Sequence, residues 1–371
     1  MLAKIKSRLL IALTLLFAWI PSGNPRAGES QEDIYAVVEV GSSGIKGQVV
    51  QIVRQDPESP PIKLLKPIDP LDANAFSFDA SASGKISAAV AGIKNQIQEQ
   101  FKLPDDHFFV VGSSGIPVDV RGNLSSKIYE ETGKNIEYAT PEMESDLLFR
   151  GIVPTHRLSQ AIVLDIGSGN SRGAYVSKIQ PNVTFSHFGV PWGTKTCASE
   201  INKIRRDGDF LVAADAFCVD TLIPAVENQL KQSPGMQTLR RIYLTGGIAW
   251  AMATLTHPYV REGPWVRITP AEITAFYEKA KTDPGRLLHP DLTSPPVDVP
   301  KSSISKANEE VSKISKVFGE DQITAGAFLL KTFAEEMHFD QKDAIFFRKD
   351  ALYAWPQGYI LQKVSAKGKA R

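Results

Sequence analysis

One short pattern occurs twice in this chain, and the repeat constrains the fold more than any other feature of the sequence. Residues 36–50 read AVVEVGSSGIKGQVV, and residues 162–176 read IVLDIGSGNSRGAYV. The two segments align without a gap at an offset of 126 residues, which matches Glu39 with Asp165. Each has an apolar run, an acid, a turn of small residues, a base and a second apolar run. Each segment predicts a β-hairpin, and two hairpins in register predict two related halves of one fold.

The turns of these hairpins contain more small residues than a strand reversal needs, since two residues such as Asn-Gly are enough. Glycines let the backbone approach a ligand closely, consecutive N–H groups form an anion-binding nest, and serine hydroxyls add donors. Either turn alone is compatible with an ordinary glycine-rich hairpin, whereas the pair in register favours phosphate binding. The candidate phosphate-binding residues are Gly41, Ser42, Ser43, Gly44 and Lys46 in the first hairpin and Gly167, Ser168, Gly169 and Asn170 in the second.

An acid ends the first strand of each hairpin, Glu39 in one and Asp165 in the other. Such a carboxylate can hold a divalent cation through water, because magnesium keeps part of its hydration shell in proteins. We therefore expect Glu39 and Asp165 to form a site for Mg²⁺ or Mn²⁺. The two turns would then hold a chain of phosphates from both sides, with the metal between them.

A third junction of small residues lies at Thr245-Gly246-Gly247. It follows a strand predicted over 241–244 and precedes an apolar helix that starts near Ile248. A strand, two glycines and a helix N-terminus make an arrangement suited to an anion or a nucleotide, so Gly246 and Gly247 are candidate substrate or nucleotide contacts. The glycine pair also permits close packing of the helix on the strand.

Composition limits the classes of function. The chain has 371 residues, 43% hydrophobic and 22% charged, which is globular and leaves room for about two domains. The net charge of +1 gives no field that would attract nucleic acid or an anionic membrane surface, so we expect neither as a partner.

The N-terminal segment differs from the rest of the chain. Lys4, Lys6 and Arg8 precede an apolar run over 9–20, which ends before Pro21-Ser22-Gly23. This pattern predicts a signal peptide over residues 1–28 and a periplasmic or secreted protein without a stable membrane span. The alternative is an uncleaved N-terminal anchor, although the run is shorter than the roughly twenty residues of a membrane-spanning helix.

The two cysteines, Cys197 and Cys218, leave the redox state open. They could pair in an oxidising compartment or remain as two buried thiols. Together with scattered histidines they give no zinc-type spacing.

Several local elements can be read from the pattern. Apolar residues at helical spacing predict a helix over 85–101, which leads to a strand over 107–111. Thr140 followed by Pro141 predicts a helix N-cap and first turn. Residues 55–72 hold several prolines and are expected to be irregular.

The three small-residue turns, in this order, resemble those of the actin-like ATPase superfamily. Within it, the chain is most similar to the exopolyphosphatase/guanosine pentaphosphate phosphohydrolase (Ppx/GppA) family, which typically reads D-I-G-S-N-S-I-R and D-I-G-G-G-S-T-E in its hairpins. VVGSSGIPVD (110–119) corresponds to the family's A-T-S-A-x-R, and residues 130–152 correspond to its E-T-G and I-S-G-x-E-E-A. The C-terminal stretch 323–361 resembles A-G-A-L-I-L and S-D-x-G-L-R-E-G. The resemblance covers residues 34 to 365.

This resemblance implies an α/β fold of two actin-like (ribonuclease H-like) domains, with mixed sheets flanked by helices and an interdomain cleft. Domain I would span 33–157 and domain II 158–367. The family's phosphatases activate water with a carboxylate, and the alignment assigns that role to Glu144. An acid in a first helical turn also stabilises the helix dipole without any catalysis.

The chain departs from the family pattern at four positions of the expected site. Glu39 replaces an Asp, Pro117 replaces an Arg, Met143 replaces a Glu, and Arg172 replaces the Glu of the second hairpin. Arg121 lies near the missing Arg, at a different spacing. These changes either strengthen anion binding or remove metal-dependent hydrolysis.

Three functions follow as hypotheses. The leading one is an exported Ppx/GppA-type phosphatase that hydrolyses a terminal phosphoanhydride of polyphosphate or of a polyphosphorylated nucleotide. The second is an apyrase-type nucleoside di- or triphosphatase, whose D-A-G-S-S-G-T-R turn resembles residues 41–44. The third is a non-catalytic relative that binds phosphate or nucleotide. The expected partner is a polyphosphorylated substrate, and a homodimer is possible.

Overall fold

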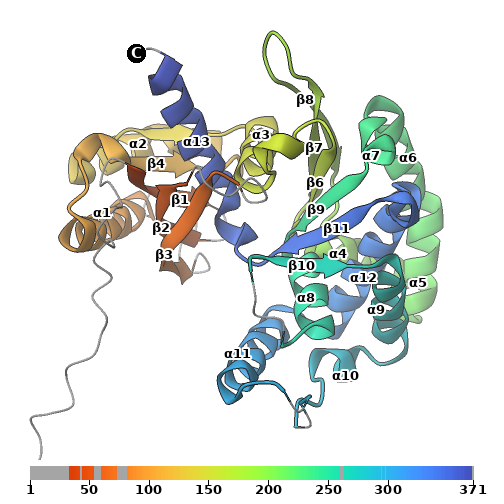
Figure 1. Ribbon diagram of the computed structural model, residues 1–371. Coiled ribbons are helices and arrows are strands. Elements are labelled where there is room, and N and C mark those ends of the chain that lie inside the picture. The colour runs from red at the N-terminus through yellow and green to blue at the C-terminus, as the bar shows by residue number, and fades with distance from the viewer. Residues whose placement is uncertain are drawn as a thin grey trace, which may run out of the picture. The chain divides into compact units, whose positions relative to one another are not determined.

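Two mixed β-sheets with helices packed against them make up the structure, a computed structural model (Figure 1). It describes residues 33–41, 44–53, 60–72, 82–259, 263–293, 295–296 and 298–369. The predicted signal peptide and the candidate residues Ser42 and Ser43 lie outside these ranges. In the described part of the chain, no helix combines the length and apolar character that a membrane crossing requires.

The first sheet has the strand order β3-β2-β1-β4-β5 in the described residues. β2 pairs with β1 and with β3 in antiparallel fashion, whereas β1, β4 and β5 run parallel. The strands are β1 (Ile34–Gly41), β2 (Gly44–Ile52), β3 (Ile62–Asp72), β4 (Phe108–Gly112) and β5 (Ile136–Tyr138).

The second sheet repeats this topology, in the order β10-β11-β9-β6-β7-β8 over the described residues. β7 pairs antiparallel with β6 and β8, and β6, β9 and β11 run parallel. The two sheets thus confirm the prediction of related halves, because β6 and β7 occupy the places that β1 and β2 have in the first sheet. The strands are β6 (Ala161–Ile166), β7 (Ser171–Lys178), β8 (Thr184–Val190), β9 (Arg241–Thr245), β10 (Trp265–Ile268) and β11 (Ala344–Arg348).

Helices connect the strands of both sheets. In the first half they are α1 (Ala82–Phe101), α2 (Val118–Thr132) and α3 (Pro141–Ile152). In the second half they are α4 (Thr194–Arg205), α5 (Phe210–Phe217), α6 (Ile223–Gln232), α7 (Gly235–Thr238), α8 (Gly247–Thr256), α9 (Pro270–Thr282), α10 (Pro284–Leu288), α11 (Lys301–Val317), α12 (Glu320–Glu336) and α13 (Ala354–Lys369).

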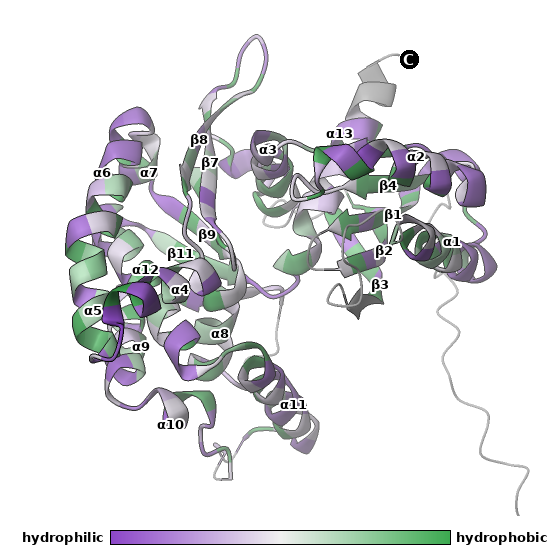
Figure 2. Ribbon diagram, turned by 180° about the vertical axis from the view of Figure 1, so that it is seen from behind, coloured by the Kyte–Doolittle hydropathy of each residue, from purple (hydrophilic) through white to green (hydrophobic). Residues whose placement is uncertain are grey.

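The helix predicted over 85–101 is α1, and its apolar stripe faces the first sheet. Ile86, Val90, Ile93 and Ile97 are buried in one core cluster with residues of β1, β2 and β4. Figure 2 shows the apolar strands of this sheet beside α1 and α2, which carry hydrophilic residues on their other sides. The period of the sequence therefore identified both the helix and its buried face.

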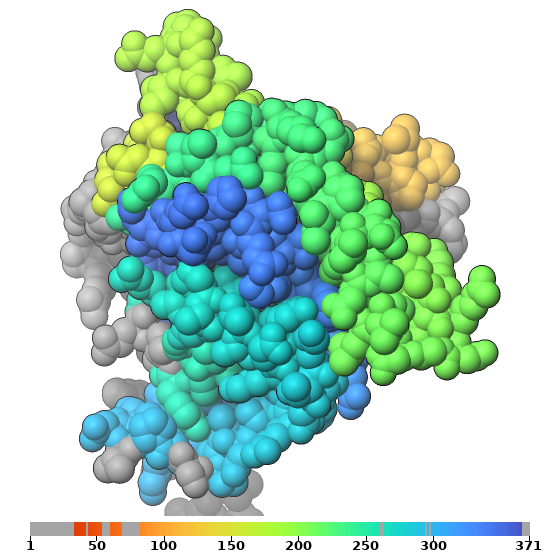
Figure 3. Space-filling view, turned by 90° about the vertical axis from the view of Figure 1, so that its right-hand side faces the viewer, coloured from red at the N-terminus to blue at the C-terminus, as the bar shows by residue number. Residues whose placement is uncertain are grey.

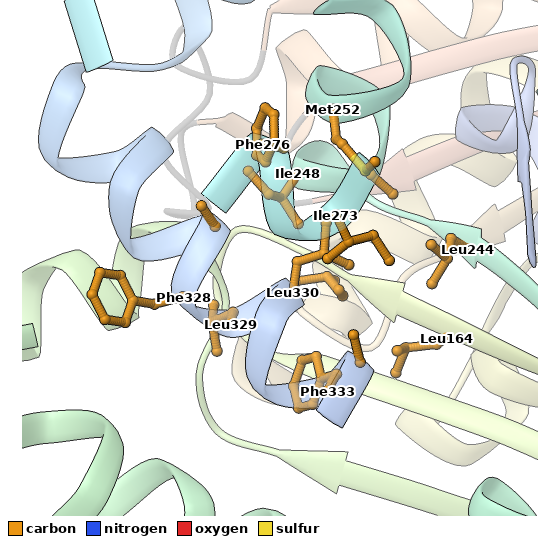
Figure 4. Close-up of a cluster of buried hydrophobic side chains, with 14 of the residues drawn as sticks. Leu164, Leu244, Ile248, Met252, Ile273, Phe276, Phe328, Leu329, Leu330 and Phe333 are labelled. Atoms are coloured by element: carbon orange, nitrogen blue, oxygen red, sulfur yellow. The ribbon is translucent and has the colours of Figure 1, made fainter. Parts of the chain in front are cut away.

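The largest core lies in the second half. Leu164 of β6 and Leu244 of β9 pack with Ile248 and Met252 of α8 and with Phe333 of α12 (Figure 4). In the space-filling view of Figure 3, the blue and teal surfaces of α12 and α9 lie side by side, next to the green helices before β9. This packed layer holds β6 and β9 in place, and both strands end at the candidate site.

The expectation of an irregular segment over 55–72 is wrong for its second part, where β3 extends from Ile62 to Asp72. The strand contains Pro67, which lies opposite Gln48 of β2. β3 is at the edge of its sheet in the described residues, and an edge strand tolerates proline because one of its sides has no neighbouring strand to bond. The pairing of β3 with β2 also contains two register irregularities, which further accommodate prolines.

The C-terminal helix α13 packs mainly against α3 and also contacts β1, although the predicted boundaries place it in domain II. Two small core clusters meet these helices. One joins Phe149 and Ile152 of α3 to strands of the second sheet, and the other joins Leu147 of α3 and Ile360 of α13 to strands of the first. The pair α3–α13 therefore lies against both sheets (Figure 1).

Two glycines let α3 and α13 touch through their backbones. A Cβ atom on Gly358 would overlap the carbonyl oxygen of Leu147, and one on Gly151 would overlap that of Ala354. Only glycine fits at either position, because the opposing atoms belong to helix backbone and cannot move aside.

A buried polar network reinforces the same contact. The guanidinium of Arg348 in β11 donates to the carbonyl of Gly151, to the Asp350 carboxylate at 2.5 and 2.9 Å, and to Gln357 of α13 at 2.9 Å. Gln357 in turn donates to Gln48 of β2 at 3.1 Å. Hydrogen bonds thus run from one sheet to the other through α13, and they satisfy polar groups that would be costly to bury alone.

We expect Gly358→Ala to lower the free energy of unfolding by about 1–3 kcal/mol or more, because the added methyl group forces two helix backbones apart. The matched control is Gly92→Ala in the middle of α1, where a Cβ meets no atom within 4 Å. That change should raise stability by up to about 1 kcal/mol through helix propensity. Urea unfolding of both variants tests the contact, and equal stabilities would contradict it.

The cysteines are free, buried thiols in this structure, which favours one of the two alternatives left open by the sequence. Burial raises the pKa of both thiols, that of Cys218 to about 12. A thiol reagent at pH 8 should therefore modify the native protein slowly and should modify two groups per chain after unfolding in denaturant. Two thiols that never react under non-reducing conditions would instead indicate a disulfide.

Candidate active site

The first hairpin places an acid and a base opposite each other. Glu39 of β1 pairs with Lys46 of β2, and Gly41 pairs with Gly44 at the turn. Both charged side chains are buried, with the Lys46 Nζ atom 3.0 Å from Glu39 Oε1. Glu39 Oε2 is buried without a hydrogen-bond partner among the described residues.

The second hairpin repeats this pairing, with Asp165 of β6 opposite Arg172 of β7. The Nε atom of Arg172 lies 3.7 Å from Asp165 Oδ2. The matched acids and bases of the sequence repeat are thus matched cross-strand pairs in the structure. At both turns, the carboxylate that was expected to face a metal faces a basic side chain.

The turn of the second hairpin rests on the N-terminus of α4. The Gly167 and Ser168 carbonyls accept hydrogen bonds of 2.9 Å from the Thr194 and Lys195 N–H groups, and Gly167 N–H donates to the Asn170 carbonyl. In a trans peptide the N–H points away from the preceding carbonyl, so the Ser168 and Gly169 N–H groups are directed away from α4. Ser168, Gly169 and Asn170 are exposed, whereas Gly41 and Gly44 of the first hairpin are buried.

Glu144 lies in the first turn of α3, where the sequence placed it. The Thr140 side chain accepts a hydrogen bond from the Met143 N–H, and Pro141 occupies the first helical position, which confirms the predicted helix start. The Glu144 carboxylate is buried, and Oε1 accepts a 2.6 Å hydrogen bond from the Ser114 N–H. Oε2 accepts a 2.5 Å hydrogen bond from Arg172 Nη1.

The turn after β4 connects Glu144 to the first hairpin. Ser113 follows β4, and its N–H donates to the Val40 carbonyl. Its hydroxyl lies next to Gly41, 3.4 Å from the position that a Cβ atom would have there. The next residue, Ser114, donates to Glu144. Glu144 therefore has the first hairpin on one side, through this turn, and Arg172 of the second hairpin on the other.

Arg121, near the start of α2, contacts the same turn through its side chain. Its guanidinium donates to the carbonyls of Ile116 at 3.0 Å and Ser114 at 3.3 Å, and it stacks over the Tyr138 ring. Arg121 thus supplies positive charge close to Ser114 even though Pro117 occupies the position where an Arg was expected.

The third junction supports the second hairpin. The Thr245 hydroxyl at the end of β9 donates to Asp165 Oδ1 at 2.8 Å. Gly246 has φ = 89°, and a Cβ there would overlap the backbone of Ile166. Glycine is therefore required at position 246 because the backbone approaches β6 closely there. This supports close packing as the reason for Gly246. Contact of Gly246 or Gly247 with a substrate stays a prediction.

The arrangement does not fit the predicted metal site. The Glu39 carboxylate bonds to the Lys46 ammonium, and Asp165 bonds to Thr245 and faces Arg172. A divalent ion between Glu39 and Asp165 would meet two cationic side chains. Of the oxygens of these two carboxylates, only Glu39 Oε2 is buried without a hydrogen-bond partner among the described residues. Among the described residues, no three His, Cys, Asp or Glu side chains lie close enough together to hold a metal.

Sequence reasoning did not identify three of the contacts that shape this site. They are the Ser114 N–H bond to Glu144, the Thr245 bond to Asp165, and the bridge that Arg172 makes between two carboxylates. The resemblance identified Arg172 as a departure from the family pattern, and the repeat aligned it with Lys46. Neither observation predicted that Arg172 contacts α3.

A further pair lies beside Glu144 on α3. Asp146 Oδ1 is 2.7 Å from His187 Nε2 of β8, and burial raises the pKa of Asp146, an effect that the His187 contact opposes. This pair fixes the same helix turn to the second sheet, next to the Arg172 contact.

Two cavities on the described surface lie apart from these residues. One of about 470 Å³ lies between α4 and the start of α12, with Lys195, Asn202 and Asp321 among its lining residues. The other, of about 380 Å³, lies between β3 and Arg348. Neither is lined by Glu144 or by the hairpin residues.

Comparison with known proteins finds similarity at the level of structure. No protein-family model and no curated protein matches the sequence. The crystal structure of the Aquifex aeolicus member of the Ppx/GppA protein family matches with a TM-score of 0.63 and 15% identity, over 90% of this chain and 98% of that one. An exopolyphosphatase from Cytophaga hutchinsonii matches with a TM-score of 0.54 and 11% identity, over 90% and 98% of the two chains.

A second Aquifex aeolicus structure, described as a type II variant of the Ppx/GppA phosphatase, matches with a TM-score of 0.60 and 15% identity, over 89% and 98% of the two chains. Each of these matches covers about nine tenths of this chain. The chain thus has the two-domain, actin-like α/β fold of the Ppx/GppA structures.

Proposed function

We propose that the protein hydrolyses the terminal phosphoanhydride of polyphosphate or of a polyphosphorylated nucleotide. The observation that carries the proposal is the position of Glu144, whose carboxylate is held between the turn next to the first hairpin and Arg172 of the second. The shared fold with the Ppx/GppA structures supports it.

The proposed reaction needs one proton acceptor and several anion contacts. A water molecule attacks the terminal phosphorus, Glu144 accepts its proton, and the bridging P–O bond breaks. The products are orthophosphate and a chain that is shorter by one phosphate. The exposed turn of the second hairpin would contact the phosphate oxygens, because such transfer depends mostly on positioning and charge stabilisation.

One observation favours the non-catalytic alternative. Both oxygens of Glu144 accept hydrogen bonds in this structure, one from Ser114 and one from Arg172. A carboxylate that stays in this ion pair is a poor base, and the protein would then bind a phosphate chain without cleaving it.

We also propose that the protein is exported. The support is the sequence of residues 1–28, a basic start followed by an apolar run and small residues. An exported protein would meet polyphosphate or nucleotides outside the cytoplasm.

The central test is Glu144→Gln with Glu142→Gln as its matched control, since Glu142 lies in the same helical turn and is exposed. We expect Glu144→Gln to lower phosphate release from polyphosphate by about 10²–10⁴-fold, the usual contribution of a general base. Glu142→Gln should retain activity. Release is measured from polyphosphate, guanosine pentaphosphate and ATP, each with and without magnesium.

The outcomes separate the three hypotheses. Preference for ATP or ADP over polyphosphate would indicate an apyrase-type enzyme. Binding of every substrate without release, by folded wild-type protein, would rule out hydrolysis and leave the binding role.

Export has its own test. Expression of the full chain in a bacterium should give a protein in the periplasmic fraction whose N-terminus, read by mass spectrometry, lies near residue 28. A chain that keeps Met1 and sediments with membranes would indicate the anchor instead.

A further inference from the structure

We propose that Arg172, rather than a divalent metal, is the main cation of the anion site, and that a bound phosphate chain releases Glu144 by taking Arg172 from it. The inference rests on the proposed function. It concerns how the site binds an anion, so it can be wrong even if the protein hydrolyses phosphoanhydrides.

Arg172 is placed for such an exchange. Its Nη1 atom donates to Glu144 Oε2 at 2.5 Å, and its Nε atom is 3.7 Å from Asp165 Oδ2. The guanidinium presents its donors as a planar fork that suits phosphate as well as carboxylate. One side chain can therefore pass from a carboxylate to a phosphate without a large movement.

The exposure of the two side chains shows whether an anion from solvent meets Arg172 or Glu144 first. The Arg172 side chain is 25% exposed, whereas the Glu144 side chain is 6% exposed. An anion that approaches the second hairpin from solvent thus reaches the guanidinium before the carboxylate. Hydrogen bonds to Arg172 then draw it away from Glu144 Oε2, because the two acceptors compete for the same donors.

The charge balance of the site is compatible with binding without a metal. Lys46 forms an ion pair with Glu39, and Arg172 contacts both Glu144 and Asp165. Arg121 adds a third positive charge beside Ser114 without contacting an acid there among the described residues. A metal is not needed to neutralise these acids. Lys46 and Arg172 already contact the two carboxylates that would have held one.

The remaining contacts of Glu144 keep it in position after Arg172 leaves. The Ser114 N–H still donates to Oε1 at 2.6 Å, and the helix start at Thr140 and Pro141 fixes the backbone. Oε2 then becomes free to accept a proton from water. The same exchange thus couples occupancy of the anion site to release of the base.

The probe is inorganic tripolyphosphate, and its affinity for the full-length protein is measured by titration calorimetry at low salt. We expect wild-type protein to bind it in EDTA about as tightly as in magnesium, at equal free tripolyphosphate. Arg172→Gln should bind about 10- to 100-fold more weakly, the usual effect of losing a charge-assisted hydrogen bond. Arg172→Lys keeps the charge without the fork and should fall between the two.

Arg240→Gln is the matched control. It also removes an Arg from an ion pair with a carboxylate, that of Asp343 at 2.7 Å, but on the protein surface away from the hairpin turns. Its affinity for tripolyphosphate should equal that of wild type. Thermal unfolding of each variant shows whether it is folded before its affinity is compared.

The tripolyphosphate affinity of Glu144→Gln distinguishes an anion-binding role of Arg172 from a purely structural one. The neutral amide holds the guanidinium less strongly than the carboxylate does, so tripolyphosphate should bind this variant more tightly than wild type. Glu142→Gln should leave the affinity unchanged.

Three results would overturn the inference: binding that requires magnesium, wild-type affinity in folded Arg172→Gln, or unchanged or weaker binding in folded Glu144→Gln. Magnesium-dependent binding with turnover would refute the role of Arg172 while leaving the proposed hydrolase intact. Metal-free binding that depends on Arg172, with no turnover of any substrate, would refute the hydrolase while supporting the anion site.

Discussion

The backbone contact between α3 and α13 determines where the candidate site can form. Gly151 and Gly358 let the two helix backbones touch, and Arg348 adds hydrogen bonds to Gly151 and Gln357. The two helices pack on strands of both sheets through small clusters on either side of α3. Because Glu144 lies at the start of α3, this packing brings its carboxylate within reach of Arg172 and of the turn after β4.

Local pattern was enough to predict several parts of this arrangement. The repeat at residues 36–50 and 162–176 predicted both hairpins, because strand alternation and turn chemistry are local properties. The helix start at Thr140 and Pro141 was also correct. β3 was missed because its prolines argue against a strand unless the strand is known to lie at a sheet edge, and edge position is a property of the assembled sheet.

The contacts between elements could not be predicted in this way. Ser114 and Glu144 are distant in the sequence and meet through a backbone N–H, which any residue type would supply. Arg172 was noted only as a substitution, because a charge change in a motif does not show which carboxylate it contacts. Glu39 and Asp165 align with expected metal ligands, yet each lies opposite a basic residue on the neighbouring strand of its hairpin.

The length of α3 between Glu144 and Gly151 has a consequence for the chemistry at the start of the helix. From Glu144 to Gly151 the helix rises about 10 Å, at about 1.5 Å per residue, so it acts as a short rigid lever. Its far end is held at Gly151 by the backbone contact with Ala354 and by Arg348, while its near end holds the proposed proton acceptor. A disturbance at the Gly151–Ala354 contact therefore reaches the Glu144 carboxylate through the helix itself, although the contact lies about 10 Å from it along the helix axis.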